Sequence, residues 1–239
     1  MIVLLLNLPE INLMDQLLSA FKIKINENLF LSDPSSSKLG QKIISHAVIL
    51  IDELGFEKFT FKKLGEKIES PEASIYRYFR SKNQLLTYLI SCYWAWLEYQ
   101  LVFETANIPS PELRLEKAIA LVTKNNFNHS VVEGIEMDKL YRILISESSK
   151  SYLTKDVDKA NKEGAYFNYK QFVGRLALLI KEISPRYKYP NMLLSTIIEG
   201  AHLQVFFAEH LPGLTNKQKS NNYITRFYSN LAIQAIKNK

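Results

Sequence analysis

The sequence predicts an all-α fold, with three short helices near the N-terminus followed by a domain of longer helices. Apolar residues recur at three- and four-residue spacing along most of the chain, and runs that alternate β-branched and polar residues are scarce. Glycines are also few, with eight in 239 residues. We expect an N-terminal extension or arm at residues 1–32, a helix-turn-helix unit at 33–82 and a helical domain at 83–239.

The composition is that of an ordinary globular protein, because 47% of the residues are hydrophobic and 23% are charged. Lys and Arg number 30 against 24 Asp and Glu, and the net charge of +6 permits a polyanionic partner. The single cysteine, Cys92, excludes a disulfide framework and suits a reducing compartment. The apolar run at residues 2–6 is too short to span a bilayer and is poorly built as a signal peptide, so we expect a cytoplasmic protein with no membrane partner.

The first helix is predicted to begin with Asp33 as its N-cap and Pro34 at its first position. Gly55 is placed to end this helix in a left-handed conformation. The apolar stripe between these two signals consists of Leu39, Ile43, Ala47, Leu50, Ile51 and Leu54. A stripe at this spacing is typical of an amphipathic helix.

A second, short helix is predicted to begin after Thr60, and a third after Ser70, with Pro71 at its first position. The residues that these two helices would bury are Leu64, Ile68, Ile75 and Phe79. Two short helices with a tight connection predict a helix-turn-helix.

A fourth helix is predicted to begin after Ser81, where residues 81–84 match a capping box, and to end before Pro109. The later helices are predicted at residues 111–128, 136–148, 156–183, 190–210 and 216–236.

When the apolar residues of the third helix point inward, a set of small, aromatic and basic residues points outward. This set consists of Ala73, Ser74 on the flank, Tyr76, Arg77 and Arg80. Small residues permit close approach, and arginine and tyrosine reach bases and phosphates, as on a recognition helix in a major groove. Lys62, Lys63 and Lys82 lie where backbone phosphates would flank such a helix. Two core-packing helices with solvated charges would share much of this pattern.

Residues 38–97 resemble the DNA-binding domain of the TetR (tetracycline-repressor-like) family of transcriptional regulators. The resemblance rests on a first helix that closes on Gly55-Phe56, on Phe59-Thr60, and on the stretch IYRYFRSK at residues 75–82. That stretch meets every fixed position of the family signature: aliphatic, Tyr, variable, Tyr or His, Phe, variable, Ser or Asn, Lys. The resemblance implies a sequence-specific DNA-binding regulator, a repressor, that has no cofactor and is not an enzyme.

The resemblance also implies contacts for individual residues. Thr60 would cap the second helix and touch a phosphate, and Lys62 would reach a phosphate or a base edge. The residues implied to face bases are Ala73, Ser74 and Arg77, with Arg77 the candidate for a guanine contact. The residues implied to hold the phosphate backbone are Tyr76, Tyr78 and Lys82.

The sequence departs from the family pattern in two places. Glu-Ser-Pro stands at residues 69–71, where the family usually has Gly-Val-Ser, and Glu69 and Glu72 bring negative charge toward the DNA. The N-terminal extension is longer than the usual leader, and its basic residues Lys22 and Lys24 would enter a minor groove or pack on the protein; we favour packing. The alternative function is a helical protein-interaction module that uses a helix-turn-helix scaffold without binding DNA.

In regulators of this family the remaining helices form a ligand-binding and dimerising domain, so the resemblance implies a homodimer. The last two predicted helices carry wide apolar faces that would suit a two-fold interface. These faces consist of Met192, Leu193, Leu194, Ile197, Ile198, Ala201, Val205 and Phe206, and of Tyr223, Ile224, Phe227, Leu231 and Ile236. Gly200 would permit close approach. The alternative is that both faces belong to the core of a monomer.

The middle helices are dense in aromatic residues, which favours a pocket for an apolar or aromatic effector. These residues are Tyr93, Trp94, Trp96, Phe103, Phe127, Tyr141, Tyr152, Tyr166, Phe167, Tyr169 and Phe172. Aromatic residues at helical spacing are also typical of an ordinary core, which is the alternative interpretation.

The sequence shows no pattern for a metal or a catalytic site. The four histidines, His46, His129, His202 and His210, form no HExxH motif. Glu199 and His202 share a helix face, as many structural pairs do. No glycine-rich phosphate loop or GxSxG motif occurs, and Cys92 is expected to be a small core residue.

Overall fold

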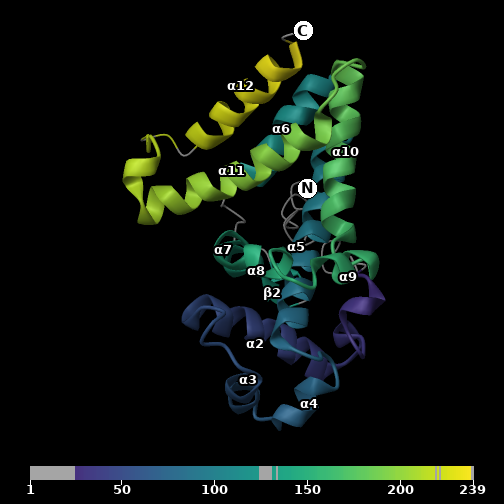
Figure 1. The fold of residues 1–239 in the computed structure, drawn as a ribbon, viewed down its shortest axis with the longest axis vertical. Helices are drawn as coiled ribbons and strands as arrows, with labels where there is room; N and C mark the ends of the chain where they lie inside the picture. Colours follow the sequence, from purple (N-terminus) through teal and green to yellow (C-terminus); the bar gives the residue numbers. More distant parts are fainter. Residues whose placement is uncertain (1–24, 124–130, 133, 219, 221, 238–239) are drawn as a thin grey trace, which may run out of the picture.

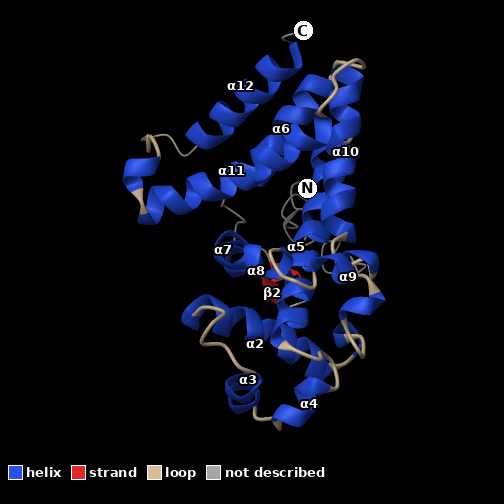
Figure 2. Ribbon diagram, in the orientation of Figure 1, coloured by secondary structure: helices blue, strands red, loops and turns tan. Residues whose placement is uncertain are grey.

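The computed structural model describes residues 25–123, 131–132, 134–218, 220 and 222–237 (Figure 1). Helices make up nearly all of the regular structure in this part of the chain, which confirms the all-α class (Figure 2). A two-residue antiparallel hairpin is the addition: β1 (Val131–Val132) pairs with β2 (Ile135–Glu136). Among the described residues, no helix is long and apolar enough to cross a membrane.

The helices have the following bounds in chain order: η1 (Glu27–Leu29), η2 (Pro34–Ser36), α2 (Lys38–Leu54), α3 (Phe61–Ile68), α4 (Glu72–Tyr76), α5 (Lys82–Thr105), α6 (Pro111–Thr123), α7 (Met137–Glu147), α8 (Ser149–Tyr152), α9 (Val157–Lys162), α10 (Phe167–Ile183), α11 (Pro190–His210), η3 (Pro212–Leu214) and α12 (Tyr223–Lys237). Figure 1 shows α2, α3 and α4 together at one end of the molecule and α6, α10, α11 and α12 at the other. α5 runs between the two groups, and α7, α8 and α9 lie at the level where they meet.

The first long helix begins four residues later than the sequence predicts. Ser37 is its N-cap, with its hydroxyl accepting the Gly40 N–H at 3.0 Å, whereas Asp33 caps the separate turn η2. The turn folds back over α2, because a Cβ at Gly40 would lie 2.2 Å from the Pro34 carbonyl oxygen. Gly55 ends the helix with φ +76°, as predicted.

The N-caps of α3 and α5 are the residues that the sequence predicts, whereas the N-cap of α4 is one residue later than predicted. Thr60 caps α3 through the Lys63 N–H at 3.2 Å, and Ser81 caps α5 through the Gln84 N–H at 3.2 Å. The capping box is incomplete, since the Gln84 side chain accepts from the Arg80 N–H instead of the Ser81 N–H. Pro71 is the N-cap of α4 and has no side-chain hydrogen bond to offer. The third helix is therefore only five residues long, and Phe79 lies beyond its end.

The predicted helix at 156–183 is two helices, because Gly164 adopts φ +81° between α9 and α10. The prediction at 136–148 corresponds to α7, with α8 following it, and α11 confirms the prediction at 190–210. The last helix begins at Tyr223, seven residues later than predicted, after η3. Residues 124–128, the predicted end of the helix at 111–128, lie outside the described residues.

The turn between α3 and α4 keeps its helix-turn-helix form without the usual glycine. Glu69 itself adopts the left-handed conformation, with φ +54° and ψ +46°. The N–H groups of Glu69 and Ser70 both donate to the Gly65 carbonyl, with the Ser70 bond at 2.9 Å. This closure brings the chain onto Gly65, where a Cβ would lie 2.6 Å from the Ser70 carbonyl oxygen. The glycine that this turn requires is therefore four residues earlier than the family position.

We predict that Gly65→Ala lowers the free energy of unfolding by about 1–3 kcal/mol, the usual cost of overpacking, because its methyl group meets backbone that cannot move aside. Gly174→Ala is the matched control: it lies inside α10 with nothing within 4 Å of its Cβ position, and should stabilise the protein by about 0.5–1 kcal/mol. Urea unfolding followed by circular dichroism measures both. Equal effects from the two substitutions would contradict the tight turn.

Candidate nucleic-acid interface and ligand cavity

The outward face of α4 is the one that the sequence predicts. Ala73, Tyr76 and Arg77 are exposed and Ser74 is half-buried, whereas Ile75 is fully buried. The Tyr76 side chain is 48% exposed, and its ring packs edge-on against Phe61 of α3 at 5.0 Å. This contact holds the ring while leaving one side of it open to a partner.

α3 contributes two of the predicted contact residues. Lys62 is exposed on its outer side, and Thr60 is exposed at its start, with the hydroxyl acting as the N-cap. Lys63 is exposed too, but its ammonium donates to the Lys58 carbonyl at 2.8 Å. Of these two lysines, Lys62 is the better placed to meet a phosphate.

Lys82 forms hydrogen bonds within the protein that the sequence did not indicate. Its ammonium donates to the carbonyl oxygens of Phe56, Glu57 and Phe59 at 3.0, 3.3 and 3.3 Å, and lies 4.6 Å from the centre of the Phe56 ring. A lysine ammonium has three protons, so these bonds use all of them. Lys82 therefore ties the start of α5 to the loop between α2 and α3. Its phosphate contact stays a prediction.

Tyr78 is likewise half-buried and engaged within the protein. Its hydroxyl lies 2.8 Å from the hydroxyl of Ser37, the N-cap of α2, and its carbonyl accepts the Leu31 N–H at 2.8 Å. Tyr78 thus joins three segments beside α4. Its predicted phosphate contact also stays untested.

The described end of the N-terminal extension packs on the protein. Asn26 and Asn28 donate to the carbonyls of Gly164 and Glu163 at 3.3 and 2.9 Å, between α9 and α10. Gln84 of α5 donates to the Asn28 carbonyl at 3.2 Å. Residues 25–31 therefore connect the helix-turn-helix unit to the helical domain. Lys22 and Lys24 lie outside the described residues.

A polar clasp, made of Glu147 on α7, Lys150 on α8 and the loop at Phe56 and Glu57, joins the two parts on another side. The Phe56 N–H donates to the Glu147 carboxylate at 3.1 Å. The Lys150 ammonium lies 2.8 Å from Glu147 and 2.7 Å from Glu57. Its hydrogen bonds to Glu147 and Glu57 raise the pKa of Lys150, and the hydrogen bond from Lys150 lowers the pKa of Glu57. Because Glu147 is 9% exposed, its pairing is needed to offset desolvation.

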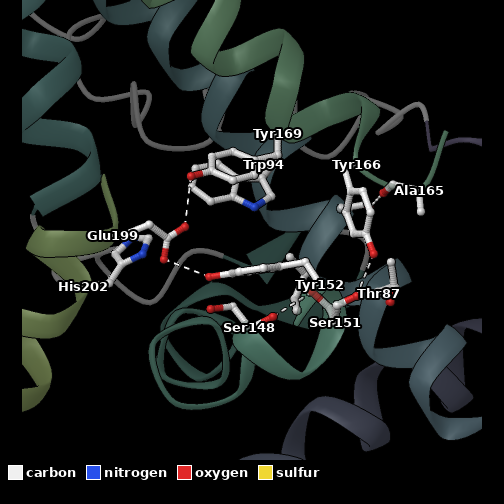
Figure 3. A pocket seen from close by; sticks show the side chains of 12 residues that line it. Thr87, Trp94, Ser148, Ser151, Tyr152, Ala165, Tyr166, Tyr169, Glu199 and His202 are labelled. Carbon is white, nitrogen blue, oxygen red and sulfur yellow. Dashed lines mark hydrogen bonds between the residues drawn. The ribbon is translucent and has the colours of Figure 1, made fainter. Parts of the chain in front are cut away.

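A cavity is lined by residues of α5, α8, α10 and α11 and of their connections (Figure 3). Its enclosed volume is about 20 Å³, and the volume reaches about 390 Å³ only when the open space at its mouth is included. It is lined by Thr87, Ile90, Ser91, Trp94, Ser148, Ser151, Tyr152, Ala165, Tyr166, Tyr169, Glu199 and His202. Four of the eleven aromatic residues predicted for a pocket are among these.

The other predicted aromatic residues are placed elsewhere. Those buried in the core are Tyr93, Trp96, Tyr141 and Phe172. Phe103 and Phe167 are about half exposed, and Phe127 lies outside the described residues. Both sequence interpretations, pocket and core, are therefore correct for different residues.

Glu199 is the polar centre of the cavity (Figure 3). Its two carboxylate oxygens accept the hydroxyls of Tyr152 at 2.9 Å and Tyr169 at 3.0 Å. Burial, together with the Glu199 charge, raises the pKa of Tyr152 to about 12 and raises that of Tyr169 as well. Both hydroxyls are therefore protonated donors at neutral pH. The Tyr169 ring stacks on Trp94 at 4.2 Å and 17°.

His202 lies one turn beyond Glu199 on α11 and is 5% exposed. It contacts Trp94 and Tyr141, with ring centres 6.1 and 6.0 Å apart. Desolvation lowers the pKa of His202 to about 4, so its imidazole is neutral at physiological pH. The sequence placed Glu199 and His202 on one helix face but gave no reason to assign them to a cavity. No cluster of three metal-ligating side chains occurs among the described residues.

The apolar faces of α11 and α12 divide between core and surface. Leu194, Ile197, Ile198, Ala201, Val205, Ile224 and Ile236 are buried within the chain. Gly200 serves a contact inside the chain, since a Cβ there would lie 2.4 Å from the Tyr228 hydroxyl. The large apolar side chains that stay exposed on these two helices are Met192 (68%), Leu203 (50%), Phe227 (59%) and Leu231 (41%).

Comparison with known proteins supports the resemblance. Residues 43–89 match the family model described as bacterial regulatory proteins, tetR family. No curated protein matches the chain. The match covers α3 and α4 completely, with parts of α2 and α5. The helix-turn-helix unit of this chain is therefore similar to the N-terminal part of tetR-family regulatory proteins.

Solved structures show the same fold over most of the chain. A transcriptional regulator from Saccharomonospora viridis, in complex with choline, has a TM-score of 0.58 at 15% identity and covers 82% of this chain and 96% of its own. AibR in complex with isovaleryl coenzyme A and operator DNA has a TM-score of 0.53 at 17% identity and covers 80% of this chain and 97% of its own. At this level of identity the likeness concerns the fold alone.

The buried His202 predicts a specific pH dependence of stability. Its pKa is about 4 in the folded protein against an ordinary 6.5, so the unfolded chain binds the extra proton between these values. The free energy of unfolding should therefore fall by about 3 kcal/mol as the pH drops from 6.5 to 4, and this contribution stops changing below pH 4. His202→Gln should remove this part of the pH dependence of the free energy of unfolding. His210→Gln, at the exposed end of α11, should leave it unchanged. Urea unfolding at several pH values measures it.

Proposed function

We propose that this protein is a sequence-specific DNA-binding regulator, a repressor that a small molecule releases from its operator. The observation that carries the proposal is the exposed face of α4 within a domain that matches the tetR family model. Neighbours with the same fold support it, because one was solved with operator DNA and isovaleryl coenzyme A and another with choline. We infer that the protein acts in the cytoplasm and catalyses no reaction.

The proposed DNA contacts follow from which side chains of the helix-turn-helix unit are exposed. Arg77 contacts a guanine in the major groove, and the small side chains of Ala73 and Ser74 let the helix approach the bases. The residues proposed to position the protein on the phosphate backbone are Thr60, Lys62, Tyr76, Tyr78 and Lys82. Of these, Tyr76 and Lys62 are exposed and need no rearrangement.

The exposed apolar side chains of α11 and α12 are proposed to bind the same two helices of a second copy. Met192, Leu203, Phe227 and Leu231 are exposed on these two helices, and two-fold pairing of four helices would remove apolar side chains of this kind from water. Such a dimer presents two copies of α4 to one face of the DNA, with half-sites about 34 Å apart.

The effector acts through the two elements that touch both the cavity and the DNA-binding domain. α5 supplies Trp94 to the cavity and begins at Lys82, which binds the loop at residues 56–59. α8 supplies Tyr152 to the cavity and carries Lys150 of the clasp. A ligand that favours one position of these helices shifts the population between DNA-binding and released forms.

We predict that Arg77→Ala weakens binding to DNA from the region upstream of the protein's own gene by about tenfold to a hundredfold, the usual value of a bidentate guanine contact. Tyr76→Phe should weaken it less, through the loss of one hydroxyl. Fluorescence anisotropy with random DNA as competitor, at two salt concentrations, measures the affinity and its salt dependence.

Arg186→Ala is the matched control, since Arg186 is exposed and lies in the distant connection between α10 and α11. It should leave the affinity within about twofold. If Arg77→Ala behaves like this control, α4 is not the reading face. Binding that does not weaken with salt would favour the protein-interaction module instead.

We predict that Phe227→Asp converts the dimer to a monomer, because it places a charge in the centre of the proposed interface. Leu178→Asp, which is 66% exposed on α10, is the control and should remain dimeric. Sedimentation velocity gives the oligomeric state of each. A monomeric wild-type protein would show that the exposed face of α11 and α12 has another purpose.

A further inference from the structure

Aromatic rings enclose the cavity on more than one side. Figure 3 shows the stacked rings of Trp94 and Tyr169 on one side and Tyr152 on another, with Tyr166 nearby. These rings come from four different elements or connections: α5, α10, α8 and the turn before α10. An aromatic face carries partial negative charge, and rings arranged around one space therefore favour a cation there.

The one carboxylate in the lining points to the same charge. Glu199 has two neutral partners, the hydroxyls of Tyr152 and Tyr169, and no lysine or arginine of the described chain lies within ion-pair distance of it. The cavity lining contains no lysine or arginine either. Since His202 is neutral at physiological pH, the charge of Glu199 is not balanced within the cavity.

We propose that this cavity binds a compact organic cation, a methylated ammonium whose charge is balanced by Glu199 and whose methyl groups lie against the aromatic walls. The enclosed space is only about 20 Å³ and reaches about 390 Å³ only with the open space at its mouth. The ligand must therefore be small, and the surrounding rings must move aside to admit it. Methylation matters because a methylated ammonium loses little hydration when it enters an aromatic site and needs few hydrogen bonds from the protein. This proposal names the ligand class of the effector site and rests on the proposed function for its regulatory role.

His202 adds a second polar contact. Its Nε2 atom is buried and has no hydrogen-bond partner in the described structure. A buried ring nitrogen without a partner costs free energy that a ligand can recover. A hydroxyl on the cation, two or three bonds from the ammonium, would supply that partner.

The charge of the cavity excludes other effector classes. An anionic ligand such as an acyl-coenzyme A or a fatty acid would place like charge beside Glu199. A neutral aromatic ligand would bury the carboxylate further without balancing it. The sequence favours an apolar or aromatic effector, and the ligand proposed here is a cation with apolar substituents.

The same contacts link cation binding in the cavity to the DNA-binding domain. Tyr152 donates to Glu199 from α8, two residues after Lys150, which binds Glu147 and Glu57 in the clasp. A cation beside Glu199 competes with the Tyr152 hydroxyl and displaces that ring. The displacement shifts α8, and with it the hold of Lys150 on the loop between α2 and α3.

Calorimetric titration of the full chain without DNA tests the cation site directly. The probes are choline and its uncharged isostere 3,3-dimethylbutan-1-ol, which have the same shape. We expect choline to bind with a Kd below 1 mM, within the range of small cation–aromatic sites, and the isostere to bind at least tenfold more weakly. Choline binding no tighter than the isostere, or no binding by choline and tetramethylammonium up to 10 mM, roughly −2.7 kcal/mol, would overturn the proposal.

Variants separate charge from shape. Glu199→Gln keeps the size of the side chain and should weaken choline binding at least tenfold, and Trp94→Leu should do the same by removing an aromatic wall. Glu182→Gln, an exposed carboxylate on α10 outside the cavity, is the matched control and should bind as the wild type does. Thermal unfolding of each variant confirms that it is folded. Unchanged affinity in folded Glu199→Gln would also overturn the proposal.

A second readout keeps this proposal distinct from the proposed function. Choline should lower the affinity for upstream DNA at least tenfold in the wild type. Tyr152→Phe should bind choline more tightly than the wild type, because no hydroxyl competes for Glu199, but choline should change its DNA affinity less, because the hydroxyl whose displacement moves α8 is absent. Choline binding without any effect on DNA would leave the cation site standing and refute its role as the effector site.

Discussion

The burial of α5 is the constraint on which the rest of the structure depends. The helix is 24 residues long, and half of its residues are buried, on more than one side. Its first turns pack within the helix-turn-helix unit, and its later turns pack against α6, α7 and α10. A helix that is apolar on most sides must be surrounded by others. The two parts of the molecule therefore share one helix, and neither can move without the other responding.

The helix-turn-helix unit holds its reading face with few residues. α4 has only five, so its position depends on what surrounds it: the turn closed on Gly65, the ring of Phe61 under Tyr76, and Phe79 in the core. Lys82 then binds the loop between α2 and α3, which Lys150 of the clasp also contacts. The residues expected to touch DNA thus fall into two groups. One faces outward, and the other holds the outward group in place.

The cavity and the clasp share α8, which supplies Tyr152 to the cavity and Lys150 to the clasp. Glu199 and Glu147 are both carboxylates with little exposure, but only Glu147 has a cation beside it. This difference supports a structural role for Glu147 and our proposal that Glu199 balances the charge of a ligand. On this proposal, a small cation acts on the DNA-binding face of α4 through α8 and the clasp.

Much of this molecule follows from local sequence, because caps and apolar spacing act over three or four residues. Thr60, Ser81 and Gly55 mark helix ends correctly, and the stretch at residues 75–82 indicates the DNA-binding domain. The same reasoning fails where a local signal has two uses: Asp33 caps a separate turn, and Gly164 divides a predicted helix. The cavity was predicted only in part, because four of its aromatic residues were among the eleven candidates but Glu199 and His202 were not assigned to it. Tyr152 and Glu199 are 47 residues apart, and Lys82 and Phe56 are 26 apart, so no periodic pattern relates them. The sequence by itself determined the helices and the DNA-binding motif, whereas only the packing of α8, α10 and α11 against α5 decided which aromatic rings form core and which surround a carboxylate, because that choice depends on neighbours distant in the chain.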